Sequence, residues 1–417
     1  MEIELNMKRI AIIGAGVSGL TVANQLKHKY KVVVYEKEST PGGLIRCKRV
    51  DGNLYHLCGG HVFNSKRKDV LEWFWSKFER EEEFIKTDRN SVVFMEDDKH
   101  IPYPIENHVY LFDNETQEKF IDDLLNISSN NDSTPKNFEE FLKYQFGETL
   151  YNLYFKPYNE KVWRRNLKNV PLSWLEGKLP MPTVKEMIYN NINHVKEREF
   201  VHSTFWYEKN NGSQYIADKL AKDIEVRYNS EIEHVEHTTD GWHINGEQFD
   251  IIVFCGNIKQ LPSMIKGVSL SQFATEIESL EYHGTTSVFC EIDPNPYSWI
   301  YLPDSSYDSH RIICTGNFSA SNNVQGKMTA TIEFTDEISL TEIHDQLKRI
   351  PMHPKYLDHF YNKYTYPIQD ANTRKMIAEM KTVLKKENFY FTGRFADWEY
   401  YNMDIAMGAA IDLCKEL

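Results

Sequence analysis

The stretch RIAIIGAGVSGLTVANQLK, residues 9–27, constrains the fold more than any other part of the chain. It reads as a short apolar strand, a glycine-rich turn and a helix, and a second apolar strand follows at residues 31–36. Gly14, Gly16 and Gly19 have the spacing G-x-G-x-x-G. In such a turn the glycines permit a tight bend, close approach of a pyrophosphate and close packing of helix on strand. The stretch therefore predicts a βαβ unit that binds a dinucleotide.

The residues that follow favour FAD over NAD. Glu36 ends the second strand, where a carboxylate would bind ribose hydroxyls. The pair Gly42 and Gly43 comes shortly afterwards and resembles the second glycine turn of glutathione-reductase-like flavoproteins. Near the other end of the chain, Gly393 and Arg394 follow a predicted strand, as in flavoproteins whose late segment approaches the ribityl chain and pyrophosphate. Three separated segments thus predict an FAD site.

Length and composition limit the class of protein. The 417 residues are too many for one compact core and suggest two or three domains. Lys and Arg total 48 against 61 Asp and Glu, so the net charge is −13, which argues against nucleic acid or an anionic membrane as the main partner. No apolar run is long enough for a membrane helix, and no signal peptide is recognisable. The six scattered cysteines lack metal-ligand spacing, so we expect no metal and a cytoplasmic location with reduced thiols.

The pattern along the chain predicts an α/β protein with a discontinuous dinucleotide domain. Residues 1–65, 205–265 and 385–417 are assigned to a Rossmann-like FAD-binding domain. Residues 66–204 are assigned to a mainly helical insertion with a polar loop at 126–137, and residues 266–384 to an antiparallel sheet that forms the substrate domain. Strand-like alternation at 225–256 and 286–334 predicts an antiparallel sheet distinct from the opening unit.

A further glycine pair, Gly59 and Gly60, follows along the chain and is succeeded by His61. Two glycines let the backbone approach an isoalloxazine ring closely. A histidine there would hydrogen-bond the flavin or tune its electronics. The alternative interpretation is a turn histidine on a solvent face.

Eight short motifs in order resemble the flavin-dependent UDP-galactopyranose mutases, within the wider superfamily of amine oxidases and protoporphyrinogen oxidases. The motifs are GGHVF (59–63), IPYPIEN (101–107), YNEKVW (158–163), WLEGKLPMP (174–182), WIYLPD (299–304), HRIICTGNFS (310–319), YTYPIQD (364–370) and GRFADWEYYNMD (393–404). The resemblance spans nearly the whole chain.

The resemblance implies a redox-neutral isomerisation of a nucleotide-diphosphate sugar, of the kind used in cell-surface polysaccharide biosynthesis. In that family N5 of reduced FAD forms an adduct with the sugar, which then closes as pyranose or furanose. Because the reduced cofactor is needed, NAD(P)H is the expected transient reductant. The oligomeric state is left open, and a homo-oligomer is compatible with the resemblance.

Site residues are carried over on matching motif positions. Arg311, Tyr366 and Tyr400 match residues that bind the substrate diphosphate, and Arg394 and His61 match residues beside the flavin. Further substrate contacts are expected from Tyr103, Trp163 and Tyr301. His61, Arg311 and Lys178 are the expected catalytic residues.

Three departures from the family pattern fall in the substrate pocket. Lys178 replaces a second diphosphate arginine, which keeps the charge and loses the fork geometry. Glu106 replaces an amide, and His202 replaces an asparagine. The sequence therefore predicts a UDP-galactose-like substrate whose sugar or nucleotide could differ. The alternatives are an FAD-dependent oxidase or desaturase of the same superfamily and a nucleotide-binding protein with a degenerate pocket.

Overall fold

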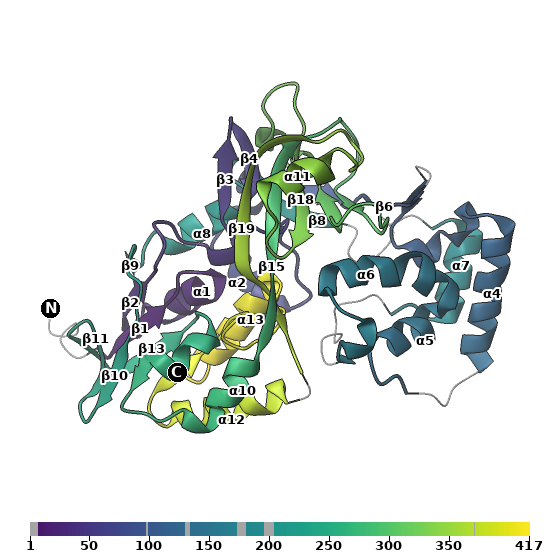
Figure 1. Cartoon of the computed structure of the whole chain (residues 1–417). Coiled ribbons are helices and arrows are strands. Elements are labelled where there is room, and N and C mark those ends of the chain that lie inside the picture. The colour runs from purple at the N-terminus through teal and green to yellow at the C-terminus, as the bar shows by residue number, and fades with distance from the viewer. Residues whose placement is uncertain (1–6, 97–98, 130–133, 173–180, 196–203, 371) are drawn as a thin grey trace.

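The computed structural model describes residues 7–96, 99–129, 134–172, 181–195, 204–370 and 372–417. Figure 1 shows a body built on two large sheets, with a separate lobe of helices beside it that contains α4, α5, α6 and α7. The purple N-terminal and yellow C-terminal segments lie together in the body, so both ends of the chain contribute to one unit (Figure 1).

The opening unit is a five-stranded parallel sheet with strand order β20-β13-β1-β2-β9. Its strands are β1 (Arg9–Ile13), β2 (Lys31–Tyr35), β9 (Glu225–Arg227), β13 (Ile251–Phe254) and β20 (Phe389–Phe391). One face packs against helices α1 (Val17–Leu26), α8 (Ser213–Ala221) and α13 (Met403–Cys414). Alternate residues of β1 and β2 enter two separate cores, one on each face of the sheet. Burial on both faces explains why these strands are apolar throughout.

The prediction that residues 225–256 belong to an antiparallel sheet distinct from the opening unit is wrong for two strands. β9 pairs in parallel with β2, and β13 pairs in parallel with β1 and β20. The segment between them supplies β10 (Val235–Thr238), β11 (Gly241–Ile244) and β12 (Glu247–Phe249) of a separate four-stranded sheet, which β14 (Ile265–Lys266), after β13, completes. A strand's own alternation does not reveal its partner, whereas the unbroken apolar run IIVF of β13 is typical of a buried parallel strand.

The second large sheet has seven strands in the order β19-β15-β18-β17-β16-β6-β7. They are β6 (Ser91–Phe94), β7 (His100–Pro102), β15 (Glu281–Glu291), β16 (Trp299–Tyr301), β17 (Arg311–Ile313), β18 (Thr329–Thr335) and β19 (Lys355–Ile368). All neighbours are antiparallel except β6 and β16. The hairpin of β3 (Cys47–Val50) and β4 (Asn53–His56) connects this sheet to the opening unit.

Two of these strands, β6 and β7, come from within the predicted helical insertion of residues 66–204. The predicted division into three domains stays a prediction. The pairing of β6 with β16 shows that part of the insertion belongs to the seven-stranded sheet. A two-stranded antiparallel sheet pairs β5 (Phe84–Asp88), in the first part of the insertion, with β8 (Thr204–Glu208) at its end.

The helices of the insertion are α2 (Lys68–Trp75), α3 (Arg80–Glu83), α4 (Asn114–Ser129), α5 (Phe138–Leu150), α6 (Lys156–Trp163) and α7 (Val184–Asn193). The predicted loop at 126–137 begins too early, because α4 continues to Ser129. Lys161 ties α6 to the seven-stranded sheet, since its Nζ donates to the carbonyls of Leu302 (2.7 Å) and Ser309 (3.1 Å).

The remaining helices are α9 (Leu261–Met264), α10 (Ala274–Ser279), α11 (Leu340–Leu347) and α12 (Thr373–Lys385). No helix in the described part of the chain has the length and apolar character needed to cross a bilayer. All six cysteines are free thiols.

The contact between α1 and β1 gives a test of the fold. A Cβ on Gly19 would lie 2.0 Å from the carbonyl oxygen of Gly14, whereas a Cβ on Gly16 would meet nothing within 4 Å. We expect Gly19→Ala to lower the free energy of unfolding by about 3 kcal/mol, because the backbone of the turn must move. Gly16→Ala, the matched control, should change it by less than about 0.5 kcal/mol. Urea denaturation of both variants as apoproteins, in which a difference in FAD affinity plays no part, checks this, and equal stabilities would contradict the close packing.

Candidate active site

The predicted dinucleotide turn lies between β1 and α1. Gly14 has φ +106°, a left-handed conformation that favours glycine. α1 begins at Val17, directly after the turn, and its first turn contains no acidic residue. The backbone N–H groups of a helix start attract anions, and the space beside Gly16 is open. A pyrophosphate therefore has room and electrostatic attraction at this point.

Glu36 is fixed beside the same turn. One oxygen of its carboxylate accepts from the backbone N of Ala15 (2.7 Å) and the other from that of Glu38 (3.0 Å). The side chain is buried, and these two bonds set its orientation. The carboxylate is thereby held next to the phosphate-binding turn, where a ribose would lie.

The other two glycine segments converge on this turn. Gly42 donates its N–H to the carbonyl of Ala15 (2.9 Å), and a Cβ on Gly43 would lie 3.4 Å from Cα of Gly16. A Cβ on Gly393 would lie 3.1 Å from Oγ of Ser18 in α1. The structure thus brings together segments from three distant parts of the sequence around one helix start, and the open cradle fits a dinucleotide.

The turn with His61 lies against the seven-stranded sheet. A Cβ on Gly60 would be only 2.6 Å from Cγ2 of Ile313, so this position has no room for a side chain. Nε2 of His61 is buried and has no hydrogen-bond partner among the described residues. Burial and the nearby Arg394 cation lower the pKa of His61 to about 4, so the ring is neutral at pH 7. An unpaired neutral imidazole nitrogen fits the edge of a cofactor ring.

Two arginines and two tyrosines form a continuous cluster beside this turn. The Nε of Arg311 donates to Glu333, and its Nη2 donates to the hydroxyl of Tyr366 (3.2 Å). The rings of Tyr366 and Tyr400 stack in parallel with centroids 5.4 Å apart. The guanidinium of Arg394 lies 4.0 Å from the ring centroid of Tyr400. This arrangement offers two guanidinium groups and two phenols to an anion.

Tyr103 and Tyr301 also lie together, with ring centroids 4.9 Å apart. Tyr301 lies opposite Arg311 in the pairing of β16 with β17, so the two side chains share one face of the sheet. Its hydroxyl accepts from Nη2 of Arg89 (2.8 Å), and the ring of Tyr158 meets it edge-on at 5.6 Å. Two neighbouring groups of predicted substrate residues are therefore on one surface.

Trp163 is 2% exposed, packs near Phe138 and belongs to the same apolar core as Tyr301. Its expected substrate contact stays a prediction. The expected site residues Lys178 and His202 lie outside the described residues.

Sequence reasoning missed Glu333, Arg89 and Tyr158, which contact predicted residues directly. Glu333 lies in the strand TATIEFT, where a lone charged residue among apolar and hydroxyl side chains was the available signal. Fully buried carboxylates are rare unless they are paired.

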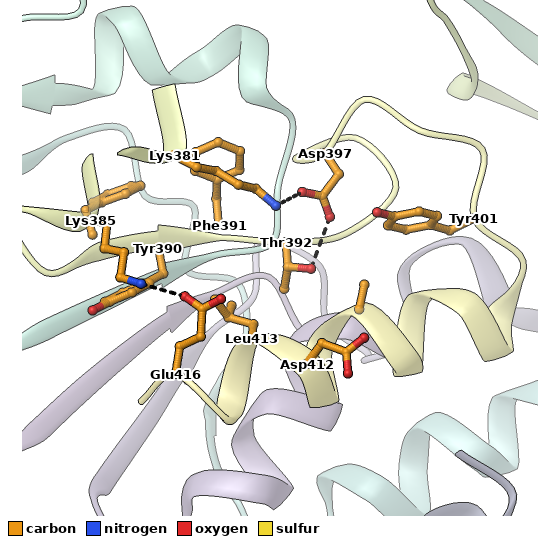
Figure 2. A pocket seen from close by; sticks show the side chains of 12 residues that line it. Lys381, Lys385, Tyr390, Phe391, Thr392, Asp397, Tyr401, Asp412, Leu413 and Glu416 are labelled. Carbon is orange, nitrogen blue, oxygen red and sulfur yellow. Dashed lines mark hydrogen bonds and ion pairs between the residues drawn. The ribbon is translucent and has the colours of Figure 1, made fainter. Parts of the chain in front are cut away.

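A cavity of about 260 Å³ lies elsewhere, between α12, β20 and α13 (Figure 2). Figure 2 shows that its lysines point to carboxylates: Lys381 contacts Asp397 (2.5 Å) and Lys385 contacts Glu416 (2.9 Å). These cations are already neutralised, so the cavity is a poor match for a diphosphate.

The glycine turns, the oriented Glu36 and the parallel sheet define a Rossmann-type dinucleotide-binding protein, and the three converging glycine segments fit FAD. Residues 12–78 match the family described as NAD(P)-binding Rossmann-like domain. A crystal structure of reduced UDP-galactopyranose mutase superimposes with a TM-score of 0.87 at 21% identity, covering 98% of this chain and 95% of that one.

Sequence similarity points in the same direction. UDP-galactopyranose mutase of Mycoplasma genitalium is 20% identical over 443 aligned positions, which cover 100% of this chain and 96% of that protein. The dTDP-fucopyranose mutase of Escherichia coli is 27% identical over 183 residues, 42% of this chain and 46% of that protein. The chain thus aligns with less than half the length of the second relative. The predicted fold class and the predicted resemblance to UDP-galactopyranose mutases are confirmed.

The open space at Gly16 gives a test of the cofactor site. In Gly16→Ala the new methyl group occupies the place where the pyrophosphate would approach, although the fold tolerates it. We expect the dissociation constant of FAD to rise at least about tenfold, which corresponds to about 1.4 kcal/mol. Fluorescence titration of the apoprotein measures it, and wild-type FAD affinity would contradict a pyrophosphate at this turn.

The buried His56 gives a pH test. Burial and His61 lower its folded-state pKa to about 3 from an unfolded value of about 6.5. Between these two pKa values only the unfolded state binds the proton. The stabilisation is therefore complete above the unfolded pKa, and the free energy of unfolding falls by about 1.4 kcal/mol per pH unit as the pH drops below it. We expect His56→Gln to lose less stability than wild type between pH 6.5 and 4.5, measured by urea denaturation. The exposed His28→Gln is the control, and identical slopes for wild type and His56→Gln would contradict the assignment.

Proposed function

We propose that this protein is a flavin-dependent mutase that interconverts the pyranose and furanose forms of a UDP-galactose-like nucleotide sugar. The observation that carries the proposal is the cluster of Arg311, Tyr366, Tyr400 and Arg394 next to the dinucleotide cradle. A cationic surface beside a flavin site suits a substrate that carries a diphosphate.

Reduced FAD, when bound, supplies the nucleophile that reacts with the anomeric carbon of the sugar. Glu36, Arg394 and the glycine turns would hold its ribose and pyrophosphate, and His61 would meet the ring system. NAD(P)H is the proposed reductant, which would bind only transiently.

Arg311 is the residue that acts on the leaving diphosphate. Its Nε is held by Glu333 and its Nη2 contacts Tyr366, so the guanidinium presents a fixed edge. Negative charge on the diphosphate grows as the bond to the anomeric carbon breaks, and a fixed cation stabilises that charge more than the ground state. Burial raises the pKa of Tyr366 well above its ordinary value, so its phenol stays protonated and able to donate.

Specificity for the sugar and nucleotide would come from the surface around Tyr103 and Tyr301. Glu106, in the turn after Tyr103, is 3% exposed, and burial raises its pKa to about 7. A carboxyl group that is partly neutral can donate a hydrogen bond to a sugar hydroxyl through its O–H. An amide at the same position would donate through an NH₂ group instead. One relative is named for a dTDP-sugar, so the nucleotide belongs in the test.

The proposed reaction is tested with dithionite-reduced, FAD-loaded protein and two nucleotide sugars, UDP-galactopyranose and dTDP-fucopyranose. The expected result is a furanose product separated by chromatography, without net consumption of reductant. Failure with both sugars, together with oxygen-dependent release of hydrogen peroxide from an amine or ring substrate, would instead support an oxidase.

Substitution of Arg311 tests the diphosphate site. Arg311→Ala should weaken UDP binding by about 2–5 kcal/mol, because a desolvated charge loses its partner. Arg311→Lys keeps a cation beside Glu333 and loses only the fork, so it should fold normally and still bind UDP less tightly. Calorimetry measures the affinities, with Arg227→Lys at a partly exposed ion pair as the control. Unchanged UDP affinity in both Arg311 variants would refute the assignment.

A further inference from the structure

Glu333 joins the two sides of the candidate site. It lies in the middle of β18, between β15 and β17, and its side chain is fully buried. One carboxylate oxygen accepts from the backbone N of Gly59 (2.8 Å), and the other accepts from Nε of Arg311. A single side chain thus binds both the turn that carries His61 and the arginine of the anion cluster.

The electrostatics show that this carboxylate is charged. Burial by itself would raise the pKa of Glu333, but the adjacent Arg311 cation, with a smaller contribution from the nearby His310, holds it well below its usual range. His310 lies 3.6 Å away, and burial lowers its pKa, so this ring is neutral at pH 7. Arg311 is therefore the cation that balances Glu333.

The two bonds constrain different parts of the site. Gly59 has φ +69°, and its N–H is directed at Oε1 of Glu333, so the bend before Gly60 and His61 is fixed relative to β18. Arg311 is held through Nε, which leaves its outer edge toward Tyr366 and the ligand side. Nη1 of Arg311 makes no hydrogen bond to any described residue, so it is available to a phosphate oxygen.

We propose that Glu333 is a positioning residue that sets the spacing between the His61 turn and Arg311. It touches neither substrate nor cofactor and acts through these two partners. The inference rests on the proposed function, because it assigns the turn to the flavin and Arg311 to the diphosphate. A shift of about 1 Å between the two would remove much of the rate, since it would misplace the flavin beside the His61 turn relative to the diphosphate at Arg311.

The test uses Glu333→Gln in the FAD-loaded, full-length protein. The amide has one acceptor and one donor group in place of two acceptor oxygens, so it cannot keep both bonds. We expect kcat of the reduced enzyme to fall about 10- to 100-fold. The dissociation constant of UDP should stay within about threefold of the wild-type value or decrease, because Arg311 keeps its charge and loses its counter-ion. A role in stability alone would lower the melting temperature and leave kcat of the folded protein unchanged.

A second measurement is independent of turnover. UDP bound at Arg311 should alter the absorbance spectrum of the oxidised flavin in wild type, and Glu333→Gln should bind UDP by calorimetry with a diminished spectral change. Glu333→Asp restores the charge at a shorter reach and should give an intermediate response, which also covers the case in which the glutamine variant does not fold. Glu208→Gln is the matched control, because Glu208 is a buried carboxylate that binds backbone N–H groups in another turn.

The outcomes separate the two claims. Wild-type kcat and spectral response in Glu333→Gln would overturn the positioning role and leave the mutase assignment standing. A wild-type protein that binds UDP with a spectral change but gives no furanose product would overturn the mutase assignment and leave the linkage supported. Absence of any UDP-induced change in wild type would contradict the linkage itself.

Discussion

The close contact between α1 and the end of β1 is the constraint on which the rest of the structure depends. Gly19 lets the helix approach the carbonyl of Gly14, and this approach directs the helix start into the space beside Gly16. Two other segments then pack on this unit, because Gly42 bonds to Ala15 in the turn and Gly393 packs against Ser18 in α1. A dinucleotide site made from both ends of the chain follows from one helix–strand contact.

The seven-stranded sheet supplies the second half of the site. Its β16, β17 and β18 place Tyr301, Arg311 and Glu333 side by side on one face. The turn at Gly59 reaches this face from the opening unit, and its backbone N–H donates a hydrogen bond to the buried carboxylate of Glu333. The charge pattern follows from burial: two arginines face the site, one carboxylate balances one of them, and the surrounding histidines are neutral.

Local chemistry made the opening unit predictable from the sequence. The glycine spacing and the apolar strands are signals carried by residues close together in the sequence, and β1, α1 and β2 lie where these signals predict them. The resemblance to the mutases, not the residue pattern, singled out Arg311, Tyr366 and Tyr400. Neither the residue pattern nor the resemblance predicted contacts between residues that are distant in the sequence. β13 was assigned to the wrong sheet, and Glu333 and Arg89 were missed, because no short stretch records which strand or turn lies opposite.

The pairing of β5 with β8 has a consequence for how the helical lobe can change over evolutionary time. Phe84 pairs with Glu208 and Asp88 with Thr204, so the chain leaves and re-enters the body at adjacent points. Because the two ends of the insertion are held together by this strand pairing, a change in its length need not displace the body of the protein. As long as β6, β7 and the Lys161 anchor are kept, the lobe can be exchanged like a module while the cofactor cradle is inherited unchanged.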